Sequence, residues 1–176
     1  KKFPEKARDR YITHEEYHAL LELAYSIEPA IAKAMEISYC CAARQGDVIS
    51  LTRQNIQEKG IYIAQGKTGK TQIKKWSPRL EKAISVKLPG IQSTTFVVHN
   101  DKGQKFTSTA FQQRFNRIKK LCAKKHPELE FDFTFHDIKA KAISDYTGDK
   151  KRFSGHKTDS QVEVYDRKIK EVDTLN

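Results

Sequence analysis

Six residues spread along the chain have side chains of the types that grip and cleave a phosphodiester. They are Arg44, Lys67, His136, Lys139, His156 and Tyr165. A phosphodiester repels nucleophiles, so cleavage without a metal needs cations on the non-bridging oxygens, an activated hydroxyl and a proton donor for the leaving oxygen. The chain has candidates for each role, and its formal net charge of +11 favours a polyanionic partner. We therefore predict chemistry on a DNA backbone, with no metal and no cofactor.

Two of these cations come from the first half of the chain. Arg44 lies in the segment Ala43-Arg-Gln-Gly-Asp47, and its planar guanidinium suits a phosphate, with Asp47 expected to hold it in place. Lys67 lies in the turn of a predicted basic hairpin, where a mobile ammonium can protonate a leaving alkoxide. Taken alone, each motif fits a solvated surface feature better. Three further lysines of the hairpin are predicted to contact DNA: Lys70, Lys74 and Lys75.

The remaining candidates lie in the C-terminal part of the chain. His136 and Lys139 are spaced to share one face of a helix that Thr134 caps, and the helix N-terminus favours an anion. Lys141 follows on the same helix and is predicted to contact DNA. His156 comes directly after a glycine, and Tyr165 follows nine residues later. Ordinary core packing is the alternative for the tyrosine, because Val162, Tyr165 and Ile169 share one helical face.

Two motifs that point to other chemistry are set aside. The segment His14-Glu-Glu-Tyr-His18 matches the HExxH zinc signature, but it falls in the first turn of a helix and has no third ligand at a recognisable spacing. The segment Gly66-Lys-Thr-Gly-Lys-Thr71 suggests a P-loop, but the required spacing of glycines fails and a strand follows it instead of a helix.

The elements that must position these residues are mostly helices. Hydrophobic periodicity, with caps at Thr13, Thr107 or Ser108, and Thr134, predicts one helix that begins at Thr13 and runs through Ala24 and another that begins at Thr134 and holds His136. It predicts further helices over residues 29–41, 45–52, 78–88, 108–125 and 160–170. Two strands at 60–64 and 72–76 form a hairpin around the turn 66–71, and residues 95–99 are extended. The predicted fold is mainly α with a small antiparallel β-sheet, an α+β class.

Length and composition bound the remaining properties. At 176 residues the chain is predicted to form one domain over 13–176, after a linker at 1–12. It begins without Met, which favours a domain excised from a longer protein. Its three cysteines include an adjacent pair, so we expect no disulfide framework and a reducing cytoplasm. No apolar run is long enough to span a membrane.

The order of these motifs resembles that of the tyrosine recombinase family, which includes the phage integrases. Nearly the whole chain takes part in the resemblance, through segments 10–16, 41–51, 65–69 and 135–138 and the later Gly-His and Tyr. It implies that Tyr165 attacks the scissile phosphate and forms a 3′-phosphotyrosine. In that mechanism Arg44 and Lys139 hold the phosphate oxygens. The resemblance implies three further roles: general base for His136, proton donor to the 5′-oxygen for Lys67 and hydrogen bonding to the phosphate for His156.

One departure concerns Lys139, because the family usually has Arg there and Lys lacks the bidentate fork. We expect Lys139→Arg to leave activity equal or higher. The stretch from His136 to His156 is also short for the family. The N-terminal core-binding and arm-binding domains of relatives are not in this chain, so we expect it to bind DNA weakly by itself.

The resemblance also implies a biological setting. It implies a phage or prophage integrase in the cytoplasm of a bacterial host, close to the nucleoid. We expect a monomer in solution and a homotetramer on double-stranded attachment sites. The tail after Tyr165 packs on a neighbouring subunit in relatives. Two alternatives stay open: a catalytically weakened DNA-binding module of the same fold, and a DNA-relaxing enzyme of the type IB topoisomerase kind.

Overall fold

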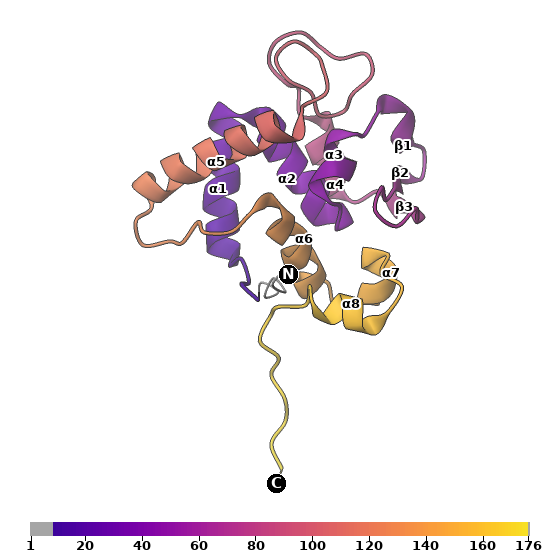
Figure 1. Cartoon of the computed structure of the whole chain (residues 1–176), viewed down its shortest axis with the longest axis vertical. Helices are drawn as coiled ribbons and strands as arrows, with labels where there is room; N and C mark the ends of the chain where they lie inside the picture. The colour runs from indigo at the N-terminus through magenta and orange to yellow at the C-terminus, as the bar shows by residue number, and fades with distance from the viewer. Residues whose placement is uncertain (1–8, 176) are drawn as a thin grey trace, which may run out of the picture.

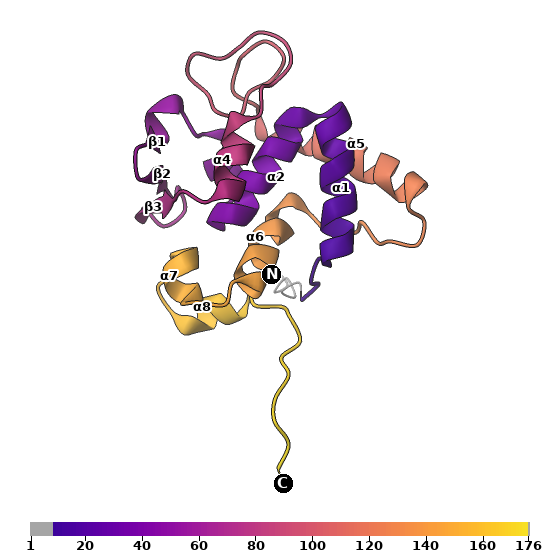
Figure 2. The same ribbon diagram turned by 180° about the vertical axis from the view of Figure 1, so that it is seen from behind.

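The computed structural model describes residues 9–175, and this part of the chain forms eight α-helices and one three-stranded antiparallel sheet. The predicted fold class, mainly α with a small antiparallel sheet, is confirmed. The helices form the body of the molecule, the sheet lies at one side, and two short C-terminal helices lie below the sheet in the view of Figure 1. Seen from behind, α4 and α2 lie between the sheet and α1 (Figure 2).

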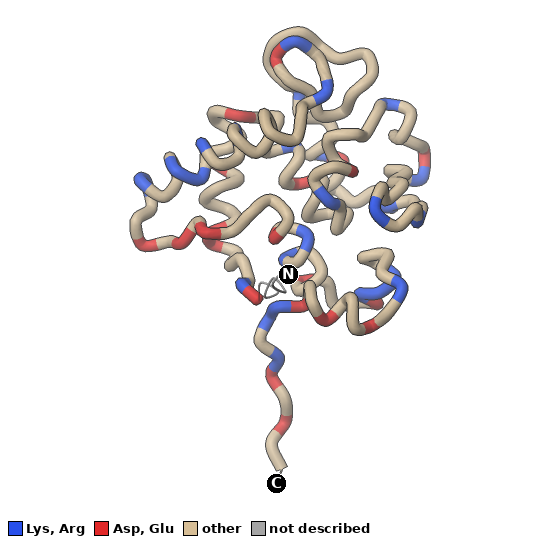
Figure 3. Tube along the Cα trace, viewed as in Figure 1, with Lys and Arg blue, Asp and Glu red and all other residues tan. Residues whose placement is uncertain are grey.

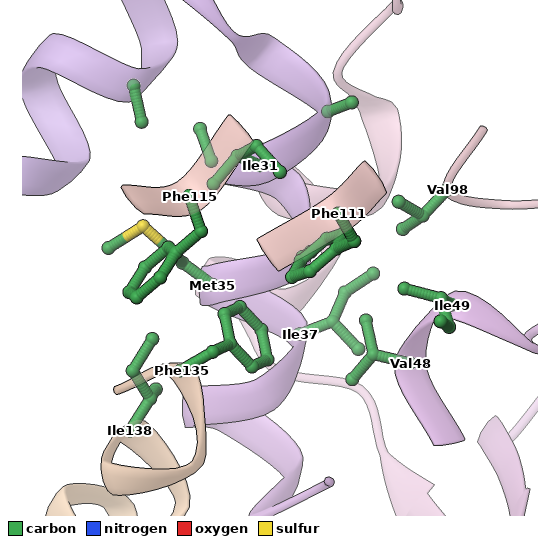
Figure 4. Packing of buried hydrophobic residues seen from close by; sticks show 14 of the residues in the cluster. Ile31, Met35, Ile37, Val48, Ile49, Val98, Phe111, Phe115, Phe135 and Ile138 are labelled. Atoms are coloured by element: carbon green, nitrogen blue, oxygen red, sulfur yellow. The ribbon is translucent and has the colours of Figure 1, made fainter. Parts of the chain in front are cut away.

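Helix α2 (Pro29–Cys41) is the centre of the body. It packs against α1 (His14–Ile27), α4 (Pro78–Ser85), α5 (Ser108–Lys125) and α6 (Phe135–Asp145). Because neighbours surround it, even its charged residues are buried, and Arg79 of α4 binds Glu36 through two hydrogen bonds of 2.7 and 2.6 Å. The core between α2, α5 and α6 is a mixture of aliphatic and aromatic side chains in which Phe111, Phe115 and Phe135 meet edge to face (Figure 4).

Helix boundaries follow local capping chemistry closely. Thr13 and Glu16 form the predicted capping box of α1, and Pro29 occupies the first turn of α2 as expected. Thr107 accepts a hydrogen bond from the backbone of Ala110 and so caps α5. Thr134 caps α6 through a second box, in which the side chain of Asp137 accepts from the Thr134 backbone.

The predicted hairpin is confirmed and extended by one strand. β2 (Gly60–Ala64) pairs antiparallel with β3 (Thr71–Lys75), with Tyr62 opposite Ile73, and β1 (Ile56–Gln57) adds a short edge strand that the sequence did not predict. The helix predicted over 45–52 is shorter, because α3 (Gln45–Ile49) ends early and a 3-10 turn, η1 (Arg53–Asn55), leads into the sheet. The stretch predicted as extended at 95–99 contributes one isolated bridge, between Phe96 and Thr52.

The C-terminal part differs most from the prediction. A helix predicted over 160–170 is wrong: α8 (Asp159–Glu163) ends early, and α7 (Lys150–Ser154), which was not predicted, precedes it. The chain then leaves the body as an extended tail (Figure 1). Ile169 is 92% exposed, so the alternative that it shares a buried face with Tyr165 is wrong.

The N-terminal boundary also moves. Residues 1–8 of the predicted linker lie outside the described residues, but Ile12 is fully buried and Arg10 binds Glu16 and Asp132. The packed domain therefore includes residues 10–12. Within residues 9–175, no helix has the length and apolar character that crossing a membrane requires.

Candidate active site

Three of the six predicted residues, His136, Lys139 and His156, lie around the side chain of a fourth, Tyr165. Its hydroxyl lies 3.1 Å from Nε2 of His136, a hydrogen-bond distance. The His156 ring stacks on the tyrosine ring at 4.8 Å between centroids, with an angle of 26° between the planes. Nζ of Lys139 lies 5.5 Å from the centroid of the same ring. Tyr165 thus lies beside the basic residues of the same chain, between α6 and the loop that follows α7.

Arg44 is placed by a tight turn at the end of α2. Ala42 adopts a left-handed conformation, with φ of 50° and ψ of 39°, which is unusual for a residue with a side chain. The Ser38 hydroxyl donates to the carbonyl of Ala43 and fixes the turn. The methyl group of Ala42 belongs to a small buried cluster with Ile143 and Val162, against which Tyr165 packs. The turn ends with Arg44 at the N-cap position of α3.

Asp47 does not hold Arg44 as predicted. One of its oxygens accepts a hydrogen bond of 3.0 Å from the backbone of Gly66, so it anchors the hairpin turn that carries Lys67. The Arg44 guanidinium instead donates to the side-chain oxygen of Gln65, at 3.2 Å. The second oxygen of Asp47 is buried and has no hydrogen-bond partner among the described residues.

Gln65 joins three parts of the site, and the sequence analysis did not assign it a role. Its oxygen accepts from Arg44, while its amide donates to the carbonyl of Ser154 at the end of α7, at 3.0 Å. A side chain at Gly155 would meet the Gln65 amide nitrogen at 2.5 Å, and φ there is +74°. The left-handed backbone before His156 therefore favours glycine, and a side chain there would have to displace the Gln65 amide. The available signal was the position of Gln65 directly before the Gly-Lys-Thr-Gly turn.

Two basic groups in the site are buried without hydrogen-bond partners. Lys139 is fully buried, and its Nζ has no hydrogen-bond partner within residues 9–175; burial and the nearby charge of Arg44 lower its pKa to about 7. Nδ1 of His156 is likewise buried and unpaired, and burial together with Lys139 lowers the pKa of His156 to about 4. Partial desolvation, Lys139 and Arg44 lower the pKa of His136 as well. Such a site favours an anion, which supplies both hydrogen-bond acceptors and negative charge.

The structure separates the lysines predicted to contact DNA. Lys67 and Lys75 are exposed and Lys70 is partly exposed, so all three remain accessible. Lys74 is half-buried: it donates to the carbonyl of Phe153 in α7, and burial lowers its pKa to about 8. It therefore ties the sheet to α7, and basic residues of these two elements lie next to one another (Figure 3).

The prediction that Lys141 contacts DNA is wrong. The side chain is buried, and its Nζ lies 3.0 Å from a carboxylate oxygen of Asp145 and donates to the carbonyl of Ile12 at 2.9 Å. Lys141 therefore anchors the N-terminal segment to α6.

Within residues 9–175, no group of three or more His, Cys, Asp and Glu side chains is arranged to hold a metal ion. The histidine of the HExxH segment nearest to a carboxylate, His14, is largely exposed and lies 3.9 Å from Asp145.

Comparison with known proteins shows the family to which the chain belongs. A sequence model described as the phage integrase family matches residues 10–171. The chain belongs to the phage integrase family. No curated protein matches it. Its fold is that of the tyrosine recombinase catalytic domain, as the following solved structures show.

A lambda integrase fragment, residues 75–356, solved as a dimer bound to a COC′ core site, shares 19% identity at a TM-score of 0.76. Lambda integrase solved as a tetramer bound to a Holliday junction matches at 0.74 with 19% identity, and XerA recombinase at 0.71 with 14%. These alignments cover 98%, 98% and 94% of this chain, but only 64%, 52% and 61% of the solved chains. The integrase domain described here thus spans less than two thirds of the length of each relative.

Proposed function

We propose that this integrase-family domain is the catalytic part of a site-specific DNA recombinase that cleaves and rejoins strands through a 3′-phosphotyrosine. The observation that carries the proposal is the placement of Tyr165. Its hydroxyl lies 3.1 Å from His136, beside two buried basic side chains that have no hydrogen-bond partner among residues 9–175. A tyrosine that served only the core would not need these groups.

The proposed reaction uses side chains alone. Oη of Tyr165 attacks phosphorus, its proton passes to Nε2 of His136, and the bond from phosphorus to the 5′-oxygen breaks. The lowered pKa of His136 keeps its ring neutral near pH 7 and able to accept that proton. Arg44 and Lys139 hold the non-bridging oxygens. The bond energy remains in the phosphotyrosine, so the 5′-hydroxyl of a partner strand can reverse the reaction.

The outer groups complete the chemistry. Lys67, in the exposed turn between β2 and β3, gives a proton to the leaving 5′-oxygen. Its charge contributes to lowering the pKa of Lys139. His156 hydrogen-bonds the phosphate through Nδ1, which is buried and has no hydrogen-bond partner among residues 9–175. Lys70 and Lys75 contact the DNA backbone.

The biological setting is part of the proposal. We propose a phage or prophage integrase that acts on bacterial DNA in the cytoplasm, near the nucleoid. The family match supports this, and the relative solved as a tetramer on a Holliday junction supports assembly into a tetramer on DNA. By itself the domain is proposed to be a monomer.

Covalent capture tests the reaction. We expect the domain, incubated with supercoiled plasmid in EDTA and quenched with SDS, to yield protein attached to DNA. After nuclease and protease digestion, mass spectrometry should find the nucleotide on the peptide that contains Tyr165. DNA binding without any adduct, from this domain and from the full-length protein on its own site, would favour the catalytically weakened module. An adduct on another residue would contradict the assigned nucleophile.

The pH dependence of DNA binding tests the role of Lys139. A bound phosphate raises the pKa of an adjacent ammonium. Lys139 has a pKa of about 7 in the free protein, so above pH 7 it takes up a proton when DNA binds. We therefore expect affinity for a short duplex to be constant below about pH 7 and to fall above it, by at most about tenfold per pH unit. Lys139→Arg should remove this component, because Arg stays charged.

Fluorescence anisotropy at constant salt measures the affinity, and the difference between parent and variant isolates Lys139 from other titrating groups. Arg44, Asp47, Lys67 and Lys74 also bear on this lysine electrostatically and are shared by both proteins. Parallel pH curves for the two proteins would refute a titrating lysine in the phosphate site.

A further inference from the structure

The segment around the candidate nucleophile is fastened to α6 by residues that the proposed reaction does not use. The Ser144 hydroxyl donates to the carbonyl of Tyr165 at 3.0 Å and accepts from the backbone of Arg167 at 2.7 Å. One side chain of α6 thus spans the backbone on both sides of Asp166. Asp166 itself lies 2.9 Å from Nζ of Lys150, at the start of α7.

The strongest of these contacts is an ion pair with little access to solvent. Nη1 of Arg167 lies 2.7 Å from Oδ1 of Asp137, and the two side chains are 7% and 2% exposed. The same guanidinium nitrogen donates to the carbonyl of Arg10, at 3.1 Å. Asp137 also caps α6 through Thr134, so Arg167 is joined to the helix turn that carries His136.

The fastening stops abruptly at Arg167. Ile169, Val172 and Leu175 are 92%, 83% and 101% exposed, and the chain runs away from the body after the anchor (Figure 1). On the other side, α8 is a single helical turn of 5 residues, which is too short to be stable without tertiary contacts. The anchor that follows Tyr165 therefore adds to its contacts with His136, His156 and the cluster around Val162 in fixing its position.

We propose that Arg167, through Asp137 and Ser144, is a positioning residue that holds Tyr165 against His136 before DNA binds. The inference rests on the proposed function for its effect on cleavage, but the anchoring itself is a property of the free protein. Fixing a nucleophile near its attack geometry lowers the entropy lost on reaching the transition state, and small misplacements cost up to about a hundredfold in rate. Loss of the anchor should therefore slow cleavage and leave DNA affinity unchanged.

Proteolysis of the free domain tests the anchoring without any activity. Chymotrypsin cleaves after tyrosine, and the bond after Tyr165 is protected while the segment is fastened. We expect Arg167→Ala to release the C-terminal fragment at least about tenfold faster than the parent, well below the melting temperature. Lys168→Ala is the matched control, because it changes the next residue, which is exposed and lies beyond the anchor. Equal release from the two variants would overturn the proposal.

Two further variants guard against a general loss of fold. Arg167→Ala removes the ion-pair partner of Asp137 Oδ1, although Thr134 still donates to the other carboxylate oxygen, so Ser144→Ala, which removes only a hydroxyl, is measured beside it. It should also accelerate release. Arg167→Lys restores the charge and should recover part of the protection. Release that rises only in step with a lower melting temperature would overturn the proposal.

A cleavage assay distinguishes failure of the positioning role of Arg167 from failure of the proposed function. In single turnover with saturating protein, Arg167→Ala should form the adduct about ten to a hundredfold more slowly, with unchanged affinity for DNA. A loss of affinity that accounts for the whole effect would refute a positioning role. If the parent forms no adduct, the proposed function fails, while the protease measurement still decides whether Arg167 anchors Tyr165.

Discussion

Tyr165→Phe is expected to abolish covalent capture of DNA while leaving the fold and DNA binding intact. The change removes one hydroxyl, whose hydrogen-bond partner is His136. The ring, which stacks on His156 and lies under Lys139, is retained. Since no other atom of the side chain can attack phosphorus, the adduct should fall below detection, whereas the melting temperature and affinity for a duplex should match the parent.

The matched control is Tyr146→Phe. Tyr146 is a partly exposed tyrosine at the end of α6 that stacks on Phe153, with 4.1 Å between the ring centroids. It carries the same phenol group and directly follows the helix that holds His136, but its ring stacks on Phe153. Capture by the Tyr146 variant should equal that of the parent. An adduct that persists in Tyr165→Phe would mean that another residue attacks.

Arg44→Ala is expected to reduce the rate of cleavage by about 10²- to 10³-fold or more, the range found when one preorganised donor to a developing oxyanion is removed. The charge of Arg44 lowers the pKa of each of the three basic residues around Tyr165: His136, Lys139 and His156. Arg44→Lys should recover only part of the rate, because an ammonium cannot donate two parallel hydrogen bonds to a phosphate.

Arg152→Ala is the matched control for charge. Arg152 is an exposed arginine of α7, and its backbone carbonyl accepts a hydrogen bond of 2.7 Å from Gln72 of the sheet. Its removal lowers the net charge by the same amount as Arg44→Ala. Comparable losses from both variants in a single-turnover capture assay would show that Arg44 acts through general attraction of DNA and has no specific role in the site.

Local chemistry explains which parts of the fold were predictable. The caps at Thr13 and Thr134 and the proline at the start of α2 act within one helical turn, so the sequence reveals them directly. α7 and the end of α8 are single turns held by contacts with distant segments, such as Gln72 with the carbonyl of Arg152. No pattern of adjacent residues encodes such contacts, and the predicted C-terminal helix was wrong for that reason.

The lysines show the same limit within the site. Lys139 and Lys141 are two positions apart on α6, and both are buried, but one faces the tyrosine and the other an aspartate. The spacing from His136 drew attention to Lys139, which lies beside the Tyr165 ring, whereas the contacts of Lys141 with Tyr11 and Ile12 are recognisable only once the N-terminal segment packs on the helix. The role of Gln65 was not predicted, because an amide side chain carries no charge and is common in many kinds of turn.

The buried ammonium of Lys139 also makes the free energy of unfolding depend on whether an anion is bound beside it. Nζ of Lys139 has no hydrogen-bond partner within residues 9–175, and a buried cation of this kind disfavours the native state unless an anion is bound beside it. An anion that binds there stabilises the native state by mass action, and its affinity includes the gain from neutralising this charge. The free energy of unfolding is thus lowest without a bound anion. The melting temperature in increasing concentrations of a simple oxyanion therefore reports the fraction of domains that have bound the anion.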